Sequence, residues 1–122
     1  MARQVLIVED EPHIVESLVF VLGREGYAVS SVMDGESALE ILRRSPPDLV
    51  ILDLMIPRLN GFEVLKAVKT DPALQVVPVM VLTAKGQVHD RRLAEDIGSD
   101  GFMTKPFSNR EIVEQVRRLI GD

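Results

Sequence analysis

The chain has 122 residues, 46% of them apolar and 27% charged, and it contains no cysteine. This length fits one domain with a single core, and the missing cysteine excludes disulfide bonds, thiolate metal sites and cysteine nucleophiles. The 14 basic and 19 acidic residues give a net charge of −5, the wrong sign for holding nucleic acid phosphates. No apolar run approaches the roughly 20 residues of a membrane span, and the N-terminus lacks a signal-peptide core. We therefore expect a cytoplasmic protein that contacts neither nucleic acid nor membrane directly.

The chain alternates short apolar runs with longer stretches of helical periodicity. The runs that read as strands, each ended by a turn or charged residue, are Gln4–Val8, Tyr27–Val32, Leu49–Asp53, Val76–Leu82 and Gly101–Thr104. The predicted helices are Pro12–Arg24, the segments between Asp34 and Pro46 and between Gly61 and Asp71, Gly86–Ile97, and a last helix that begins after Ser108. This alternation predicts a parallel sheet with helices on both faces, which is a three-layer α/β sandwich.

Two of the predicted helices carry further signals. The helix at Gly86–Ile97 is polar over most of its surface, so we expect it to be the most loosely held helix. Its inward-facing candidates are Val88, Leu93, Ala94 and Ile97. The last helix opens with Ser108 and Glu111 at the spacing of a capping box, in which each residue's side chain accepts from the other's backbone N–H.

Chemically active side chains follow four of the five predicted strands. The residues at the carboxyl ends of these strands are Glu9, Asp10, Asp53, Thr83 and Lys105. Because parallel strands end at the same side of a sheet, where ligands bind in open α/β folds, these side chains are predicted to lie close together. Each has a simpler explanation when it is taken alone: the carboxylates suit a turn or a helix N-terminus, the threonine suits a helix N-cap, and the lysine suits the surface.

Carboxylates that lie close together repel each other. At an effective dielectric constant of about 20, two unit charges about 4 Å apart cost roughly 4 kcal/mol. Lys105 can neutralise one such charge, and a hard divalent cation can neutralise two. Mg²⁺ binds through one or two carboxylates, water and phosphate oxygens. We therefore predict a magnesium site at the carboxyl end of the sheet.

Four short motifs connect these residues to a known family. They are Glu9-Asp10-Glu11-Pro12, Asp53-Leu-Met-Ile-Pro57-Arg-Leu-Asn-Gly61, Thr83-Ala84 and Lys105-Pro106-Phe107. Each motif is weak alone, but the ordered set is specific, and over essentially the whole chain it resembles the receiver domains of two-component response regulators. The resemblance implies a flavodoxin-like, doubly wound fold with a five-stranded parallel sheet in the order 2-1-3-4-5 and five helices.

The resemblance also implies a role for each site residue. Asp53 resembles the phosphoryl acceptor, and Lys105 resembles the residue that holds the phosphoryl oxygens. Asp10 and Asp53 correspond to direct Mg²⁺ ligands, as does the carbonyl of Met55, whereas Glu9 corresponds to a residue that acts through water. Asp53 would then act as a carboxylate nucleophile while the metal and the lysine neutralise charge on the phosphoryl group.

Two further positions match the family's switch residues. The hydroxyl of Thr83 is expected to turn toward the new phosphate, and the ring of Phe102 is expected to follow inward. The face made by the fourth helix, fifth strand and fifth helix would then change, and the polar fourth helix is the element that we expect to move. Family members are usually cis at the peptide bond that corresponds to Lys105-Pro106.

The resemblance implies partners as well. A sensor histidine kinase or a histidine phosphotransfer protein would donate the phosphoryl group, and a downstream effector protein or a missing output domain would receive the signal. We expect residues 1–122 to form one receiver domain with no output domain. We do not expect an enzyme, because the domain would catalyse at most its own phosphorylation and dephosphorylation. Arg91 and Glu111 fit the salt-bridge pattern by which the DNA-binding branch dimerises, but Gly101 and Gln115 depart from it, which disfavours dimerisation by that face.

Three other interpretations compete with this one. A Mg²⁺-dependent phosphatase of the haloacid-dehalogenase type also uses an aspartate after a strand, but its general acid sits two residues on, where this chain has Met55. A flavin or nucleotide binder would need a glycine-rich first strand–helix junction, whereas this one is acidic. A degenerate receiver that no longer takes phosphate would lack a required residue, and none is missing.

Overall fold

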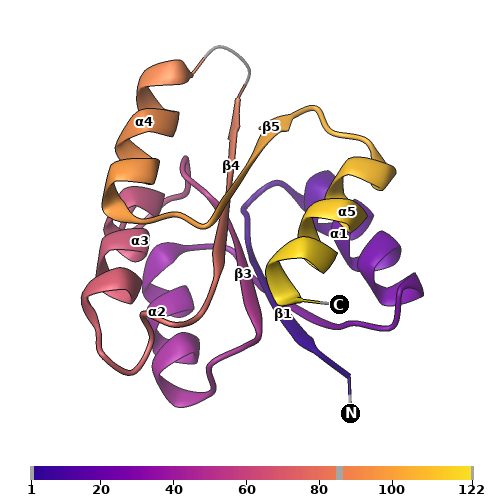
Figure 1. The fold of residues 1–122 in the computed structure, drawn as a ribbon, viewed down its shortest axis with the longest axis horizontal. Coiled ribbons are helices and arrows are strands. Elements are labelled where there is room, and N and C mark those ends of the chain that lie inside the picture. The colour runs from indigo at the N-terminus through magenta and orange to yellow at the C-terminus, as the bar shows by residue number, and fades with distance from the viewer. Residues whose placement is uncertain (1, 85–86, 122) are drawn as a thin grey trace.

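The computed structural model describes residues 2–84 and 87–121, in which strands and helices alternate along the chain (Figure 1). The strands are β1 (Gln4–Val8), β2 (Ala28–Val32), β3 (Leu49–Asp53), β4 (Val79–Ala84) and β5 (Gly101–Lys105). The helices are α1 (Pro12–Arg24), α2 (Gly35–Arg44), α3 (Gly61–Thr70), α4 (Val88–Ile97) and α5 (Asn109–Ile120).

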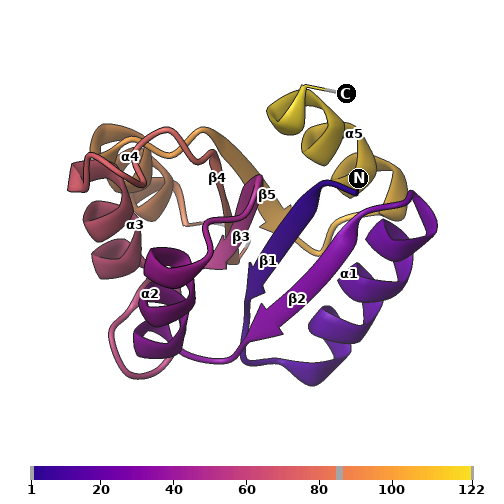
Figure 2. The ribbon, with the colours of Figure 1, turned by 90° about the horizontal axis from the view of Figure 1, so that it is seen from below.

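The strands form one parallel sheet in the order β2-β1-β3-β4-β5. Helices α1 and α5 cover one face of the sheet, and α2, α3 and α4 cover the other (Figures 1 and 2). The predicted three-layer sandwich and its strand order are therefore confirmed.

The sheet separates two apolar cores. Leu6 and Val8 of β1 pack into the core beneath α2, α3 and α4, whereas Val5 and Ile7 pack into the core beneath α1 and α5. Successive side chains of a strand point to opposite faces, so a strand covered on both sides must be apolar at every position. This requirement explains the uninterrupted apolar runs of the sequence, and it leaves the strand ends as the places where polar side chains can gather.

Side chains cap three of the helices at their N-termini. Asp34 accepts a hydrogen bond from the backbone N–H of Ser37 at the start of α2, with a distance of 2.8 Å. At α5, the Ser108 hydroxyl accepts from Glu111 N and the Glu111 carboxylate accepts from Ser108 N, both at 3.1 Å. This arrangement confirms the predicted capping box.

The predicted start of the fourth strand is wrong. Strand β4 begins at Val79 rather than Val76, and Val76 is 81% exposed. The cause is the turn after α3, where the Lys69 ammonium donates to the carbonyls of Gln75 and Val77 at 3.3 and 2.9 Å. These bonds hold the segment against the end of α3, so it joins the sheet later. At β2 the difference is smaller, because the strand starts at Ala28 and not at Tyr27.

The predicted inward face of the fourth helix is only partly correct. Val88 and Leu93 are 62% and 42% exposed, so both assignments are wrong. Within α4, all of which is described, Ala94 is the one fully buried residue, and Ile97 is half-buried. The helix therefore rests on α3 by a narrow stripe. Gly86, the predicted first residue, lies outside the described residues.

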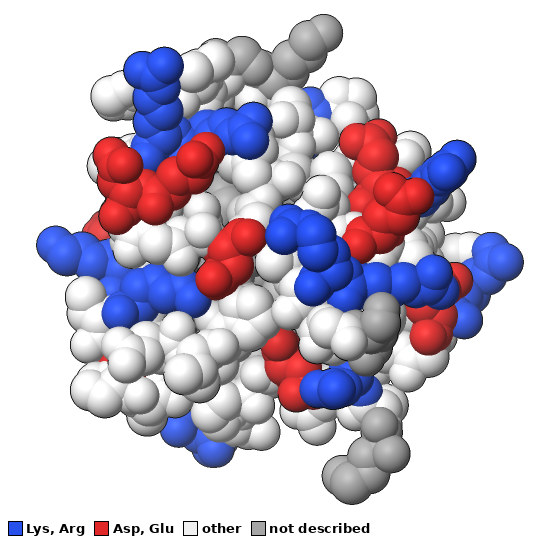
Figure 3. Space-filling model, viewed as in Figure 1, with Lys and Arg blue, Asp and Glu red and all other residues white. Residues whose placement is uncertain are grey.

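The surface carries charges of both signs. On the face shown in Figure 3, basic and acidic side chains are interspersed. Surface ion pairs contribute to this mixture, including Arg91 with Glu95 on α4 and Arg110 with Glu114 on α5. None of the helices in residues 2–84 and 87–121 combines the length and apolar content of a membrane span.

Candidate functional site

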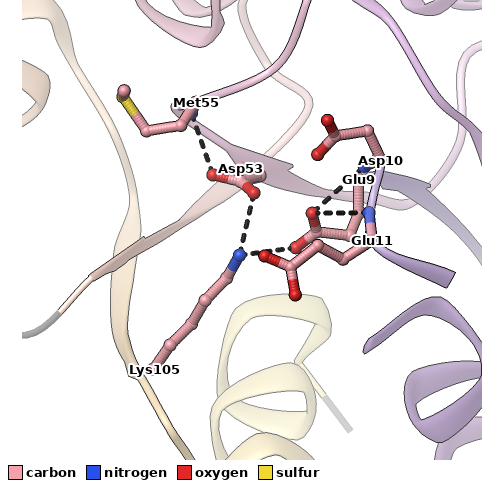
Figure 4. A network of polar contacts seen from close by, with 6 residues as sticks. All are labelled: Glu9, Asp10, Glu11, Asp53, Met55 and Lys105. Atoms are coloured by element: carbon pink, nitrogen blue, oxygen red, sulfur yellow. Dashed lines mark hydrogen bonds and ion pairs between the residues drawn. The ribbon is translucent and has the colours of Figure 1, made fainter. Parts of the chain in front are cut away.

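The sequence-predicted site residues gather at the carboxyl end of the sheet (Figure 4). Glu9 directly follows β1, and Asp53 is the last residue of β3, the next strand in the sheet. Asp53 pairs in register with Leu82 of β4, and Ala84 of β4 pairs with Lys105 of β5. The strand register thus brings together residues that are far apart in the sequence.

Lys105 joins two of the acids. Its ammonium nitrogen lies 2.8 Å from Asp53 Oδ2, to which it donates a hydrogen bond, and 2.8 Å from Glu9 Oε1. The other Asp53 oxygen, Oδ1, accepts from the backbone N–H of Met55 at 2.9 Å. Asp53 is 4% exposed, so its carboxylate is held by these contacts rather than by bulk water.

Glu9 is the most deeply buried acid of the site, with no exposed surface. Its Oε2 accepts from the backbone N–H groups of Asp10 and Glu11 at 3.1 and 3.2 Å. Its Oε1 forms the ion pair with Lys105 but accepts no well-aligned hydrogen bond from any described residue. Burial raises the pKa of Glu9 from 4.5 to about 7, with the nearby Asp53 adding to the rise and Lys105 opposing it.

The two partners of Glu9, Asp53 and Lys105, are held in their charged forms. Burial works against ionisation of Asp53, but hydrogen bonds with Glu9, Lys105 and the Met55 N–H outweigh it and hold the pKa of Asp53 below its usual value. Burial also disfavours the charged form of Lys105, but its two carboxylate partners prevail and raise the pKa of the ammonium. At neutral pH the site therefore holds an Asp53–Lys105 ion pair beside a glutamate that titrates near neutrality.

The site has the ligands that a hard cation requires. Glu9, Asp10 and Asp53 each offer a carboxylate oxygen, and these oxygens lie within 4.8 Å of one another. Lys105 neutralises one charge of this group, so three carboxylates share a single nearby ammonium. A set of carboxylate oxygens matches the preference of Mg²⁺. The residues present therefore fit a magnesium ion.

The two predicted switch residues lie on neighbouring strands, at different depths. Thr83 is 2% exposed, near the end of β4, where it pairs with Thr104. Phe102 of β5 pairs with Val81, further from the strand end, and is half-buried. The guanidinium carbon of Arg91 on α4 lies 4.4 Å from the centre of the Phe102 ring. No local sequence pattern predicts this contact, because Arg91 and Phe102 belong to different elements. The Lys105-Pro106 bond is cis, as the resemblance implies.

The loop after β3 has a backbone that its sequence does not predict. Arg58 and Leu59 have φ angles of 51° and 77°, in the left-handed region that residues other than glycine rarely adopt. The loop closes where Gly61 N donates to Leu54 O at 3.1 Å. The segment that leads away from Asp53 is thus a compact loop whose two ends are joined by this hydrogen bond.

Comparisons with known proteins agree with this geometry. The family model of the response regulator receiver domain matches residues 5–117. Among curated proteins, the chain is similar to the alkaline phosphatase synthesis transcriptional regulatory protein PhoP of Bacillus subtilis, with 40% identity over 120 residues. The match covers 98% of this chain and 49% of PhoP, so the chain spans about half the length of the curated relative it matches.

Solved structures with the same fold are also similar to this chain. One is a candidate response regulator from Chloroflexus aurantiacus, with a TM-score of 0.96 and 30% identity over 100% of both chains. Another is the receiver domain of a sensor histidine kinase from Pseudomonas aeruginosa, with a TM-score of 0.91 and 28% identity over 100% of both chains. That structure has a magnesium ion coordinated in its active site cleft. These similarities confirm the flavodoxin-like fold that the sequence motifs imply.

Proposed function

The chain belongs to the response regulator receiver domains of two-component signalling, and from this premise we propose that Asp53 is the residue on which it accepts a phosphoryl group. The observation that carries the proposal is that Asp53 lies beside both the Lys105 ammonium, 2.8 Å away, and the carboxylates of Glu9 and Asp10. A carboxylate held ionised at a strand end, beside a cation, is suited to nucleophilic attack on phosphorus.

The proposed reaction exchanges one bond to phosphorus for another. An oxygen of Asp53 attacks the phosphorus of a phosphohistidine in a sensor histidine kinase or a histidine phosphotransfer protein. The phosphorus–nitrogen bond breaks, the imidazole leaves and takes up a proton, and an acyl phosphate forms on Asp53. Phosphoryl transfer mainly needs positioned groups and neutralised charge, and Lys105 supplies a positive charge 2.8 Å from the reacting carboxylate.

We assign the metal site to the same residues. Asp10, Asp53 and the Met55 carbonyl would hold Mg²⁺ directly, and Glu9 would act through water. The bound ion would neutralise charge on the phosphoryl oxygens during transfer. The assignment is supported by the cluster of carboxylate oxygens from Glu9, Asp10 and Asp53. The magnesium ion in the cleft of the Pseudomonas aeruginosa receiver domain also supports it.

We assign the output step to Thr83, Phe102 and α4. The Thr83 hydroxyl would turn to donate to the new phosphate, and Phe102 would move inward into the space it leaves. Helix α4 would then shift, and the face formed by α4, β5 and α5 would change. The narrow buried stripe of α4 supports this role, because few apolar contacts resist the movement.

The remaining assignments concern the wider protein. We assign residues 1–122 to a single receiver domain and place it in the cytoplasm. The signal would pass to a downstream effector protein or to an output domain outside these residues. The relative PhoP, of which the chain covers 49%, is named a transcriptional regulatory protein, which is consistent with an output domain beyond the receiver. The domain itself would touch neither nucleic acid nor membrane.

The phosphatase alternative is not favoured. Its general acid would have to stand at position 55, and Met55 has no proton to donate. The side chain of Met55 is also largely exposed, at 71%. The family comparisons point to receivers and signalling proteins instead.

Two parallel incubations separate these two functions. The protein is mixed with Mg²⁺ and either phosphoramidate or an organic phosphate ester, and intact mass and released phosphate are both recorded. A receiver gains one phosphoryl group per chain, and the adduct survives acid but is lost in base. A phosphatase instead releases phosphate from an organic ester over many turnovers without keeping an adduct. Multiple turnover without an adduct would overturn the proposal.

A further inference from the structure

The loop of residues 55–60 holds a conformation that its own residues do not favour. Arg58 and Leu59 both have positive φ angles, 51° and 77°, although neither is glycine. Backbone of this kind costs about 1–3 kcal/mol per residue and persists only where the surroundings impose it. Ile56, 7% exposed, and the half-buried Leu59 pack against the core beneath α2 and α3, so the loop is held from that side. The structure therefore contains contacts that fix this loop.

The first residue of α2 makes one of these contacts. A Cβ atom on Gly35 would lie 2.0 Å from the Leu59 carbonyl oxygen and 2.9 Å from the Leu59 carbonyl carbon. Gly35 N also donates to the Pro57 carbonyl at 3.3 Å. The atoms that a side chain would strike belong to the backbone, so they cannot rotate aside. Only glycine allows this approach of the loop to α2.

The other side of the loop is fixed beside the phosphoacceptor aspartate. A Cβ on Gly61 would lie 2.6 Å from the Asp53 carbonyl oxygen, and Gly61 N donates to Leu54 O. The Met55 N–H, at the start of the loop, donates to Asp53 Oδ1 at 2.9 Å. These contacts join the two ends of the loop beside Asp53, so a displacement of Leu59 changes the backbone path of residues 55–60. Met55 is among them, and its carbonyl is one of the assigned metal ligands.

We propose that Gly35 is a positioning residue for the metal site, which it serves by letting the loop of residues 55–60 pack directly against the start of α2. The inference rests on the proposed function, since it concerns the same Mg²⁺ site. Replacing Gly35 by alanine displaces Leu59 and, through the loop, the Met55 backbone. Changes to groups that orient metal ligands typically weaken metal binding by about 10–100-fold, and we expect roughly tenfold for Gly35→Ala.

The test is a Mg²⁺ titration of the metal-free protein followed by amide NMR signals. Gly23→Ala is the matched control, because a Cβ on Gly23 meets nothing within 4 Å. Leu42→Val, at a fully buried position of the same helix, controls for lost stability without an added atom at the loop. The expected result is weaker Mg²⁺ binding in Gly35→Ala only, with shifted Met55 and Leu59 signals before metal is added.

Each outcome decides between the two claims. Equal Mg²⁺ affinity in Gly35→Ala and wild type overturns the role of Gly35, as does an equal loss in Leu42→Val. A wild type that does not bind Mg²⁺ overturns the proposed metal site and the role of Gly35 together. If Gly35→Ala does not fold, Leu59→Ala carries the test, because it weakens the packing of the loop without introducing a clash. A several-fold loss of Mg²⁺ affinity is then expected, and an unchanged affinity overturns the inference.

Discussion

The Lys105 ammonium donates to Asp53 Oδ2 at 2.8 Å, although 52 residues separate the two in the chain. The same nitrogen lies 2.8 Å from Glu9 Oε1, so one cation serves two buried carboxylates. A third acid, Asp10, offers a carboxylate oxygen within 4.8 Å of oxygens of Glu9 and Asp53. The site therefore gathers three carboxylates around the Lys105 ammonium.

Loss of the Lys105 charge should destabilise the metal-free protein. Lys105→Met leaves Glu9 and Asp53 buried without their cation, and removing one partner of a buried ion pair costs about 3 kcal/mol or more. Urea unfolding in EDTA at slightly alkaline pH measures this loss, and Mg²⁺ should restore part of it. Lys66→Met, at an exposed position of α3, is the control and should unfold like wild type. Equal stabilities of the two variants would contradict the balancing role of Lys105.

Loss of the Asp10 charge should have the opposite effect. Asp10→Ala removes one repelling carboxylate, so we expect the free energy of unfolding in EDTA to rise by about 1 kcal/mol. The variant should also lose most of the stabilisation that Mg²⁺ gives to wild type, because a bound ligand stabilises only the protein that holds it. Thermal melts with and without Mg²⁺ test both points, with Asp96→Ala on the exposed side of α4 as control. Identical melting of Asp10→Ala and wild type in both conditions would refute the charge argument.

The pH dependence of stability should report Glu9. Burial raises the pKa of Glu9 from 4.5 to about 7, so between these values the folded protein holds a proton that the unfolded chain has released. The free energy of unfolding must then fall as pH rises through this window, by up to about 3 kcal/mol. The pKa of Asp53 is lowered, so its contribution is lost only in more acidic solution.

Glu9→Gln isolates this effect, because glutamine does not titrate. In EDTA, we expect the variant to gain stability relative to wild type as pH rises from about 5 to about 8. Denaturant unfolding at intervals of pH provides the measurement. Parallel stability curves for the two proteins would show that Glu9 does not titrate in this range.

Helix α4 should open more readily than the other helices. Its N-cap residue, Gln87, makes no side-chain cap among the described residues, and Ala94 is the one fully buried residue of the helix. Helix α5 has a complete capping box and buries Ile112 and Val116. A side-chain cap is worth about 1 kcal/mol, so amides of α4 should exchange with deuterium at least several-fold faster than those of α5. Equal protection in the two helices would remove the basis for choosing α4 as the moving element.

Much of the site could be predicted from the sequence because parallel strands end together. Once Gln4–Val8 and Leu49–Asp53 are identified as buried strands, Glu9 and Asp53 must lie at the same side of the sheet. The apolar runs identify these strands plainly, since both faces of the sheet are covered. The order of the motifs along the chain then indicates the receiver-domain family.

Other features depend on tertiary contacts that no local pattern records. Val76 reads as part of a strand, but bonds from Lys69 to nearby carbonyls hold it in a turn. Gly35 reads as the first residue of a helix, and only the packed structure brings it against the backbone of Leu59. Val88 is apolar but exposed, because α4 packs against its neighbour through only a narrow buried stripe.

The most direct test of the account is the intact mass of Asp53→Asn after incubation with phosphoramidate and Mg²⁺. Asparagine keeps the shape of the side chain but cannot act as the carboxylate nucleophile. Wild type and Asp96→Asn should each gain a single phosphoryl group, and both gains should disappear in EDTA. Asp53→Asn should gain none. A phosphoryl group on Asp53→Asn, or none on wild type with Mg²⁺ present, would contradict the central claim that Asp53 is the phosphoacceptor.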